Sequence, residues 1–420
     1  MTDIITESEQ AGFASDLTQS SSLGDSVRAY GSRVRGGDMG ALPSILGLVV
    51  LFIVFGFANE RFLSNLNMAN LVTQAGSIII LAMALVPVLL LGEIDLSAGV
   101  AGGVSACVMG LAIVKHDQPW YLAVAAALVV GAFIGLLIGV LVAKLGIPSF
   151  VVTLAFFLGL QGVTLKLIGE GGSVRVNDPV ISGIANSNMS ITWGWITAIV
   201  IVVVYAALTL LRHRSKVARG LQHQPLPVVV AQIVAIAVVL VVVTYILNQN
   251  RSVNPNFPIS GIPYVLPVVI VLLIAWSFAL GRTTWGRHVY AVGGNSEAAR
   301  RAGINVDRVR ITVFMMCSAM AALSGIVAAS YGGKVSTSSG SGNVLLYAVG
   351  AAVIGGTSLF GGKGKASDAV IGGLVIATIA NGLGLLAQAS YINFLVTGAV
   401  LLLAASVDAI SRRRRSATGL

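Results

Sequence analysis

The chain has 420 residues, of which 56% are hydrophobic and only 10% are charged. A soluble domain carries roughly 25% charged residues, so this composition, with a mean hydropathy of +0.91, excludes a soluble globular protein and indicates a polytopic membrane protein. Lysine and arginine outnumber aspartate and glutamate by 26 to 16. In a membrane protein such an excess marks one side of the bilayer, so it does not indicate a nucleic-acid partner. Both cysteines, Cys107 and Cys317, lie in apolar stretches and indicate no disulfide framework.

The two ends of the chain differ from its centre. Residues 1–40 are rich in serine, glycine and acidic residues, which predicts a disordered cytoplasmic tail. The apolar run that follows begins too far along the chain for a secretory signal peptide, so we expect a retained first helix. Residues 41–410 are expected to form the transmembrane domain, and residues 411–420 a basic cytoplasmic tail.

The apolar centre is divided into segments of membrane-spanning length. A bilayer core takes about 20 apolar residues per helix, and this length predicts an all-α bundle of about twelve transmembrane helices. The predicted spans are Ala41–Ala58, Leu71–Gly92, Ser97–Val114, Trp120–Ala143, Ile147–Ile168, Trp193–Leu211, Leu226–Leu247, Ile262–Leu280, Ile311–Ser330, Val344–Leu359, Ala366–Gln388 and Ile392–Ile410. The second, the third and Val344–Leu359 are expected to include broken or re-entrant helices, which a bilayer tolerates where irregular backbone is buried in protein or lines a cavity.

The basic residues predict the orientation of these spans. Alternating the spans from a cytoplasmic N-terminus places 20 of the 26 lysine and arginine residues inside and five outside. Cytoplasmic loops carry the excess of positive charge, so the sequence predicts that both termini lie inside.

The longest inside loop, Gly281–Arg310, predicts a short capped helix. Asn295 can act as its N-cap, Glu297 in the first turn suits the positive end of the helix dipole, and Gly303 can end it. The residues that would present this helix are Gly294, Ala298, Ala299, Arg300, Arg301 and Ala302. Two interpretations are equally open. In the first, another protein docks on the helix, because the small residues allow close approach and the arginines can meet an acidic rim. In the second, the helix lies at the membrane interface, anchored by its arginines.

The run GGKGKAS, residues 361–367, is superficially similar to a phosphate-binding loop. A Walker A motif needs glycine where this chain has Thr357, and serine or threonine where it has Gly364. We therefore interpret the run as a basic, flexible inside turn.

Four motifs carry a family resemblance. Glu297-Ala298-Ala299-x3-Gly303 resembles the EAA-type loop of ABC importer permeases. Together with GEIDLSAG (92–99), AKLGIPSFVVTLAF (143–156) and AAVIGGTSLFGGKG (351–364), it resembles the branch that imports monosaccharides such as ribose, xylose, arabinose and galactose. The motifs occur in the family's order, the resemblance covers roughly Leu71–Ile410, and the Glu of GEIDLS is most similar to xylose-type permeases.

The resemblance implies the membrane-spanning subunit of an ATP-driven monosaccharide importer, with a pentose such as xylose favoured, in the bacterial plasma (inner) membrane. The chain would have no catalytic residue, no metal site and no cofactor of its own, because ATP and Mg²⁺ would be used by a separate ABC ATPase docked on the coupling loop 281–310. An extracytoplasmic sugar-binding protein would deliver the sugar, and the permease would form a homodimer or a dimer with a related permease, surrounded by membrane lipid. One departure is the apolar Leu345-Leu346-Tyr347, where relatives often carry a carboxylate pair.

Polar residues inside the spans are candidates for the translocation path, because burying them in a membrane is costly. Glu93 and Asp95 lie at the break between the second and third spans. Asp95 or Ser97 could instead cap the third span. The neutral candidates are Thr153, Gln161, Asn381 and Asn393, although such residues often bond neighbouring helices.

Two other functions remain to be weighed against this one. A secondary sugar symporter driven by a proton or sodium gradient needs carboxylates at mid-membrane, which Glu93 and Asp95 could supply. A membrane-embedded enzyme finds little support, because the spans contain no paired metal-ligand spacing.

Overall fold

The computed structural model describes residues 42–221, 223–252, 254, 256–386, 391–392, 394–400, 402–403 and 406, and over these it is predominantly helical. Within these ranges nine helices are long and apolar enough to cross a membrane. They are α4 (Asn65–Leu90), α5 (Ala98–His116), α6 (Trp120–Lys144), α7 (Ser149–Ile168), α9 (Ile191–Ala218), α10 (Leu226–Asn248), α11 (Val265–Arg282), α14 (Val306–Gly332) and α16 (Ala366–Leu385). Two apolar helices are shorter, α3 (Leu42–Ala58) and α15 (Val344–Gly355).

Smaller elements connect these helices. They are α8 (Pro179–Asn186), α12 (Thr284–Gly294), α13 (Ser296–Arg301), β1 (Ser173–Arg175), β2 (Asn188–Met189), β3 (Ile262–Pro263) and β4 (Lys334–Ser336). The four strands correct the expectation of a purely helical fold. They form two antiparallel pairs, β1 with β4 and β2 with β3, in which loops far apart in the sequence satisfy each other's backbone groups.

Several helices extend beyond the spans that hydropathy predicts. α4 begins at Asn65 instead of Leu71, because the Ser64 hydroxyl accepts the Asn67 N–H at 3.3 Å. α14 begins at Val306 instead of Ile311, where the Asn305 side chain accepts the Arg308 N–H at 2.9 Å. Hydropathy marks the apolar centre of a helix, whereas its caps and charged first turn lie outside that centre.

The predicted span Val344–Leu359 is shorter than expected. Its helix, α15, has 12 residues and ends at Gly355, so at 1.5 Å per residue it is about 18 Å long. A hydrocarbon core is about 30 Å thick, so α15 is a partial span. The last predicted span, Ile392–Ile410, includes helical residues at 392, 394–400, 402–403 and 406. Its remainder, Ala41 and both tails lie outside the described residues.

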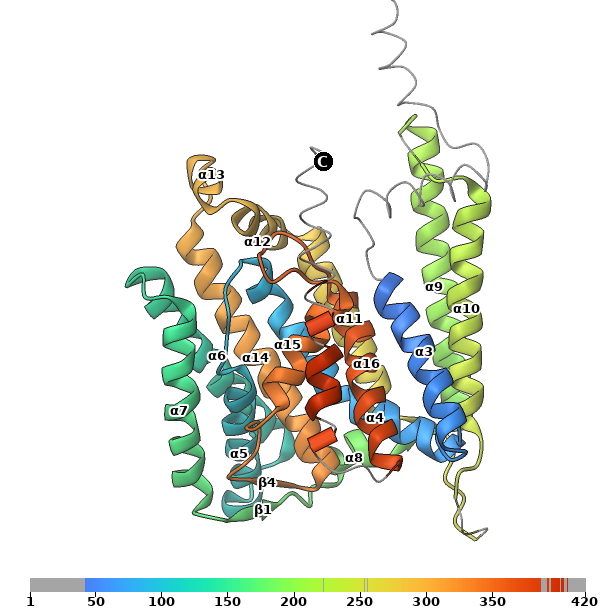
Figure 1. Cartoon of the computed structure of the whole chain (residues 1–420), viewed down its shortest axis with the longest axis horizontal. Helices are drawn as coiled ribbons and strands as arrows, with labels where there is room; N and C mark the ends of the chain where they lie inside the picture. Colours follow the sequence, from blue (N-terminus) through green and yellow to red (C-terminus); the bar gives the residue numbers. More distant parts are fainter. Residues whose placement is uncertain are drawn as a thin grey trace, which may run out of the picture.

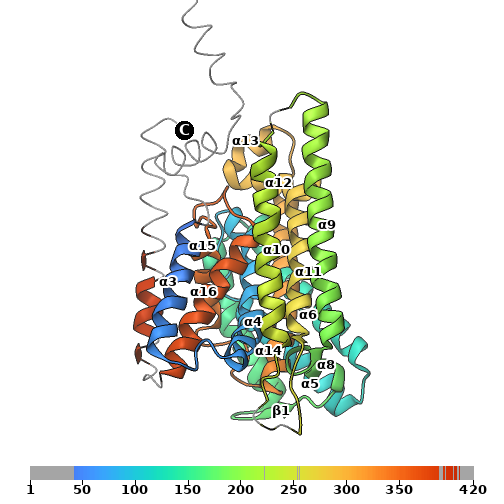
Figure 2. The same ribbon diagram turned by 90° about the vertical axis from the view of Figure 1, so that its right-hand side faces the viewer.

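α4 lies at the centre of the bundle and packs against α14, α16, α15 and α11. All its residues from Ile79 to Leu90 are buried. α9 and α10 form a hairpin at the edge, as the two views show (Figures 1 and 2), and bury few side chains. In a membrane protein such exposed apolar faces meet lipid.

Glycines on α6 bring it into backbone contact with α14. Gly131, Gly135 and Gly139 lie one turn apart on one face. A Cβ on Gly131 would lie 2.7 Å from the Ser318 carbonyl oxygen, and a Cβ on Gly139 would lie 2.7 Å from the Ile311 Cα. Small residues at this spacing let membrane helices approach closely and gain van der Waals contact.

The two ends of the bundle differ (Figure 1). α12 and α13 lie at one end, together with the turn between α15 and α16. β1, β4 and α8 lie at the other end, where Val174 pairs with Val335. The short elements therefore define two separate faces of the bundle.

Candidate functional site

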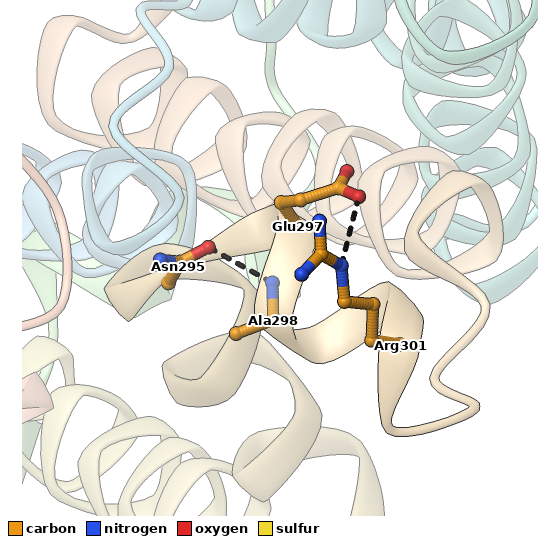
Figure 3. A network of polar contacts seen from close by, with 4 residues as sticks. All are labelled: Asn295, Glu297, Ala298 and Arg301. Carbon is orange, nitrogen blue, oxygen red and sulfur yellow. Dashed lines mark hydrogen bonds and ion pairs between the residues drawn. The ribbon is translucent and has the colours of Figure 1, made fainter.

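α13 is the exposed turn that the sequence predicts, and it is capped as expected. The Asn295 Oδ1 accepts the Ala298 N–H at 2.9 Å, and Arg301 Nε lies 3.4 Å from Glu297 Oε1 (Figure 3). The side chains of this ion pair are 80% and 61% exposed. An exposed pair contributes less than about 1 kcal/mol, so both charges can exchange it for a partner's charge at little cost.

The end of α13 is closed by Gly303, which has a φ of +84°. The Ile304 N–H donates to the Ala299 carbonyl at 3.0 Å, and the Ala299 side chain is buried. Ala299 therefore packs inward, against the expectation that it faces a partner. The other predicted coupling residues are exposed: Gly294, Asn295, Glu297, Ala298, Arg300, Arg301, Ala302 and Gly303.

α12 is an element that sequence reasoning missed. It begins at a Thr283 cap, whose Oγ1 accepts the Gly286 N–H at 3.1 Å. The Trp285 Nε1–H donates to Thr312 Oγ1 on α14 at 2.9 Å. Its buried face consists of Gly286, Val289 and Val292, which lie three apart, and this amphipathic spacing is the signal that could have revealed it.

Tyr290 fixes α12 to the turn between α15 and α16. Its hydroxyl donates to the Gly364 carbonyl at 2.6 Å. Burial raises the pKa of the Tyr290 hydroxyl, and the nearby Asp368 carboxylate raises that pKa further. The hydroxyl therefore keeps its proton and remains a hydrogen-bond donor.

The break between α4 and α5 spans residues 91–97 and carries the ionisable candidates. Glu93 Oε1 lies 3.2 Å from Arg310 Nε on α14, and the two side chains are 15% and 28% exposed. The sequence placed Arg310 in the inside loop and gave Glu93 no partner. The structure joins the break to the first turns of α14 by a largely buried ion pair.

Asp95 organises the start of α5. Its Oδ1 accepts the Ser97 N–H at 2.9 Å and the Ser97 hydroxyl at 2.6 Å. Asp95 therefore holds Ser97, the N-cap residue of α5, whose own side chain makes no capping hydrogen bond. Asp95 is 1% exposed. The Cys317 thiol on α14 also lies beside this carboxylate. Oδ1 is thus used by Ser97, and Oδ2 is buried without a hydrogen bond from an N–H or hydroxyl group of the described residues.

α7 holds the break from the other side. The Ile94 N–H donates to Ser149 Oγ at 3.2 Å. The Thr153 hydroxyl lies 2.9 Å from the Ser149 carbonyl oxygen on its own helix and 3.2 Å from the Ile94 carbonyl oxygen, and its proton is shared between these acceptors. No sequence signal revealed the role of Ser149, which follows Pro148 at the start of the helix. Both hydroxyls therefore lie against the backbone groups of Ile94, which irregular buried backbone needs to have paired.

The other neutral candidates lie apart from the break. Asn381 on α16 and Asn67 on α4 exchange two amide hydrogen bonds of 2.8 and 2.9 Å, both buried. This pair fixes one helix to the other, as the alternative interpretation expects. Gln161 is half-buried on α7, and Asn393 lies outside the described residues. The structure therefore brings Glu93, Asp95, Ser97 and Thr153 together, and Asn381 elsewhere.

Clusters of metal ligands are absent from the part of the chain that the structure describes, where no three His, Cys, Asp or Glu side chains converge. The closest histidines are His213 and His223 at the tip of the α9–α10 hairpin, with ring centroids 5.3 Å apart. The expectation of no cofactor remains a prediction.

Residues 67–405 match the family model described as branched-chain amino acid transport system / permease component. The chain is 32% identical over 372 residues to the xylose transport system permease protein XylH of Escherichia coli (strain K12), covering 88% of this chain and 92% of the relative. It is 31% identical over 370 residues to the ribose import permease protein RbsC of the same strain, covering 87% and 92%. The XylH of Haemophilus influenzae is 32% identical over 371 residues, covering 88% and 96%. No solved structure matches significantly.

Proposed function

Since the chain belongs to the branched-chain amino acid transport system / permease component family, we propose that it is the membrane subunit of an ATP-driven importer of a monosaccharide. The observation that carries this proposal is the similarity to xylose and ribose permeases over almost the whole chain. The capped, exposed α13 with its available charges supports it. A pentose, with xylose favoured, is the proposed substrate.

The proposed topology has about twelve spans, with both termini in the cytoplasm. Nine long helices, the shorter α3, the partial span α15 and the predicted span Ile392–Ile410 make up the proposed twelve, with α15 as a broken or re-entrant member. The end that carries α12 and α13 would be cytoplasmic. This assignment agrees with the positive-inside rule, because basic residues gather at this end. One of them is Lys144 at the end of α6, which lies 3.5 Å from Asp307 on the first turn of α14.

The proposed partners follow from this orientation. A separate ABC ATPase, which uses ATP and Mg²⁺, would dock on the coupling loop 281–310, and the permease domain 41–410 would hold neither nucleotide nor cofactor. A sugar-binding protein would dock at the end that carries β1, β4 and α8. The permease would work as a homodimer or with a related permease, and the tails 1–40 and 411–420 would lie in the cytoplasm.

The proposed path passes the break between α4 and α5. Asp95 has one carboxylate oxygen without a hydrogen-bond partner, Ser97 bonds its other oxygen, and Thr153 lies 3.2 Å from the carbonyl oxygen of the neighbouring Ile94. Glu93 would act through its ion pair with Arg310. A proton- or sodium-driven symporter is not favoured, because the relatives named above are transport-system permeases over the same length.

The docking proposal is tested by co-purification of the ATPase with Ala298→Trp, in which a bulky side chain replaces an exposed residue of α13. The control is Ala218→Trp at the exposed end of α9, which receives the same side chain outside the coupling loop. We expect the Ala298 variant to reach the membrane normally and lose the ATPase, and the Ala218 variant to keep it. Normal co-purification with both variants would contradict docking at α13.

The energy source is tested separately in proteoliposomes that contain the whole transporter. Xylose or ribose uptake should require ATP and survive an uncoupler of the proton gradient. Uptake that continues without ATP and stops with the uncoupler would overturn the importer proposal in favour of a symporter.

A further inference from the structure

Three chain segments meet through bare backbone beneath α12. They are the end of α4 at Leu90, the end of α12 at Gly293, and the turn between α15 and α16 at Gly361. A Cβ on Gly293 would overlap the Leu90 carbonyl oxygen and lie 3.2 Å from the Gly362 nitrogen. A Cβ on Gly361 would lie 2.8 Å from the Gly293 carbonyl oxygen and 3.0 Å from that of Leu90. No side chain fits between the three segments.

Hydrogen bonds hold the same three segments together. The Gly362 N–H donates to the Leu90 carbonyl at 2.9 Å. The Tyr290 hydroxyl, one turn before Gly293, donates to the Gly364 carbonyl at 2.6 Å. Gly361 and Gly362 have φ values of +86° and +73°, which L side chains rarely adopt. The turn is therefore built to bring its backbone against α4 and α12.

The location of this junction gives it mechanical consequences. The break that carries Glu93 and Asp95 begins directly after Leu90. α4 is buried without interruption from Ile79 to Leu90, so the helix has little room to absorb a displacement. A shift of α12 must therefore move the end of α4 and the turn with it. The break is what can yield, because its backbone is irregular.

A second connection reaches the break from α13. α14 begins a few residues after α13 and carries Arg310, which pairs with Glu93 at 3.2 Å. The break is thus held by backbone contact with α12 and by charge from α14. The first connection comes from α12, which precedes α13, and the second comes from α14, which follows it.

We propose that the Gly293–Leu90–Gly361 junction is a positioning element that transmits movement of the α12–α13 loop to the break at residues 91–97. Gly293 is its key residue, since its backbone lies against the Leu90 carbonyl with no room for a Cβ. This inference rests on the proposed function, because it requires an ATPase that moves α12 and α13. Its role is to keep sugar movement in step with ATP hydrolysis.

The test is Gly293→Ala in the complete transporter, with Gly384→Ala as the matched control. Both glycines are the next-to-last residue of a helix, but a Cβ on Gly384 meets no atom within 4 Å. We measure membrane level, ATPase co-purification, ATP hydrolysis and sugar uptake. Gly293→Ala should keep the ATPase bound and lower the sugar transported per ATP by about tenfold, a usual size for coupling between sites. Gly384→Ala should match the wild type.

Equal sugar-to-ATP ratios for the two alanine variants would overturn the proposal. If Gly293→Ala does not accumulate in the membrane, Tyr290→Phe is measured in its place. This substitution removes one hydrogen bond at the junction and adds no atoms. It should lower the same ratio about twofold or more, in the range of a single net hydrogen bond. An unchanged ratio would then refute the inference. A wild-type transporter without ATP-dependent uptake would instead refute the proposed function, so the two failures are distinguishable.

Discussion

One methyl group at Gly135 should destabilise the protein through the contact of α6 with α14. A Cβ at this position would overlap the Phe314 carbonyl oxygen and lie 2.7 Å from the Met315 Cα. Both neighbours are helix backbone, which cannot move aside as a flexible side chain can. The substitution Gly135→Ala therefore requires the two helices to separate.

The size of the effect follows from two opposed terms. Carbon atoms are at their best separation at about 3.5–4.0 Å, so the helices must part by about 1 Å. Overpacking of this kind costs about 1–3 kcal/mol. Alanine returns about 0.5–1 kcal/mol through its better helix propensity. We expect a net loss of about 1–2 kcal/mol in the free energy of unfolding.

Gly159→Ala on α7 is the control, because a Cβ there meets no atom within 4 Å. It gains the propensity term alone and should stabilise by about 0.5–1 kcal/mol. Thermal unfolding in detergent can be followed with a thiol-reactive dye, since the chain has two cysteines and both Cys107 and Cys317 are buried. Equal unfolding midpoints for the two variants would refute the packing argument.

Three further polar contacts can be tested by substitution with the same assay. Glu93→Gln and Arg310→Gln should each destabilise, and the double variant should lose less than their sum by about 1–2 kcal/mol, because the pair is largely buried; additive losses would show no coupling. Asn381→Leu should cost about 1–3 kcal/mol by leaving the buried Asn67 Oδ1 without its donor, and adding Asn67→Leu should recover part of it. Arg251→Gln should lower the unfolding midpoint, since the buried guanidinium donates to three acceptors; an unchanged midpoint would contradict that role.

The sequence predicted the features that depend on composition and near neighbours. Low charge and long apolar runs indicate a membrane bundle whatever the contacts between helices. The α13 helix was predicted because a cap and its terminator lie within a few residues, at Asn295 and Gly303. The exact helix ends at Asn65 and Val306 were missed, since hydropathy does not register polar caps.

Contacts across the fold could not be predicted from one sequence. Asn67 and Asn381 are 314 residues apart, and no periodic pattern connects two lone amides on different helices. The ion pair of Glu93 with Arg310 was hidden for the same reason. The glycines of the junction at Leu90 were visible as a turn signal, but only the three-dimensional fold brings Gly293 and Gly361 to the same carbonyl.

On the path proposed above, the contacts at the break would favour passage over tight binding. Of its two carboxylates, Glu93 is paired with Arg310, and Asp95 uses one oxygen to hold Ser97. A tight sugar site needs several polar groups converging on the hydroxyls, whereas the break offers one open carboxylate oxygen on Asp95. A sugar passing there would be held weakly and released easily. Affinity would then reside in the binding protein, and the permease would control timing, because the residues that hold the break belong to α14 and α7 and to the junction with α12.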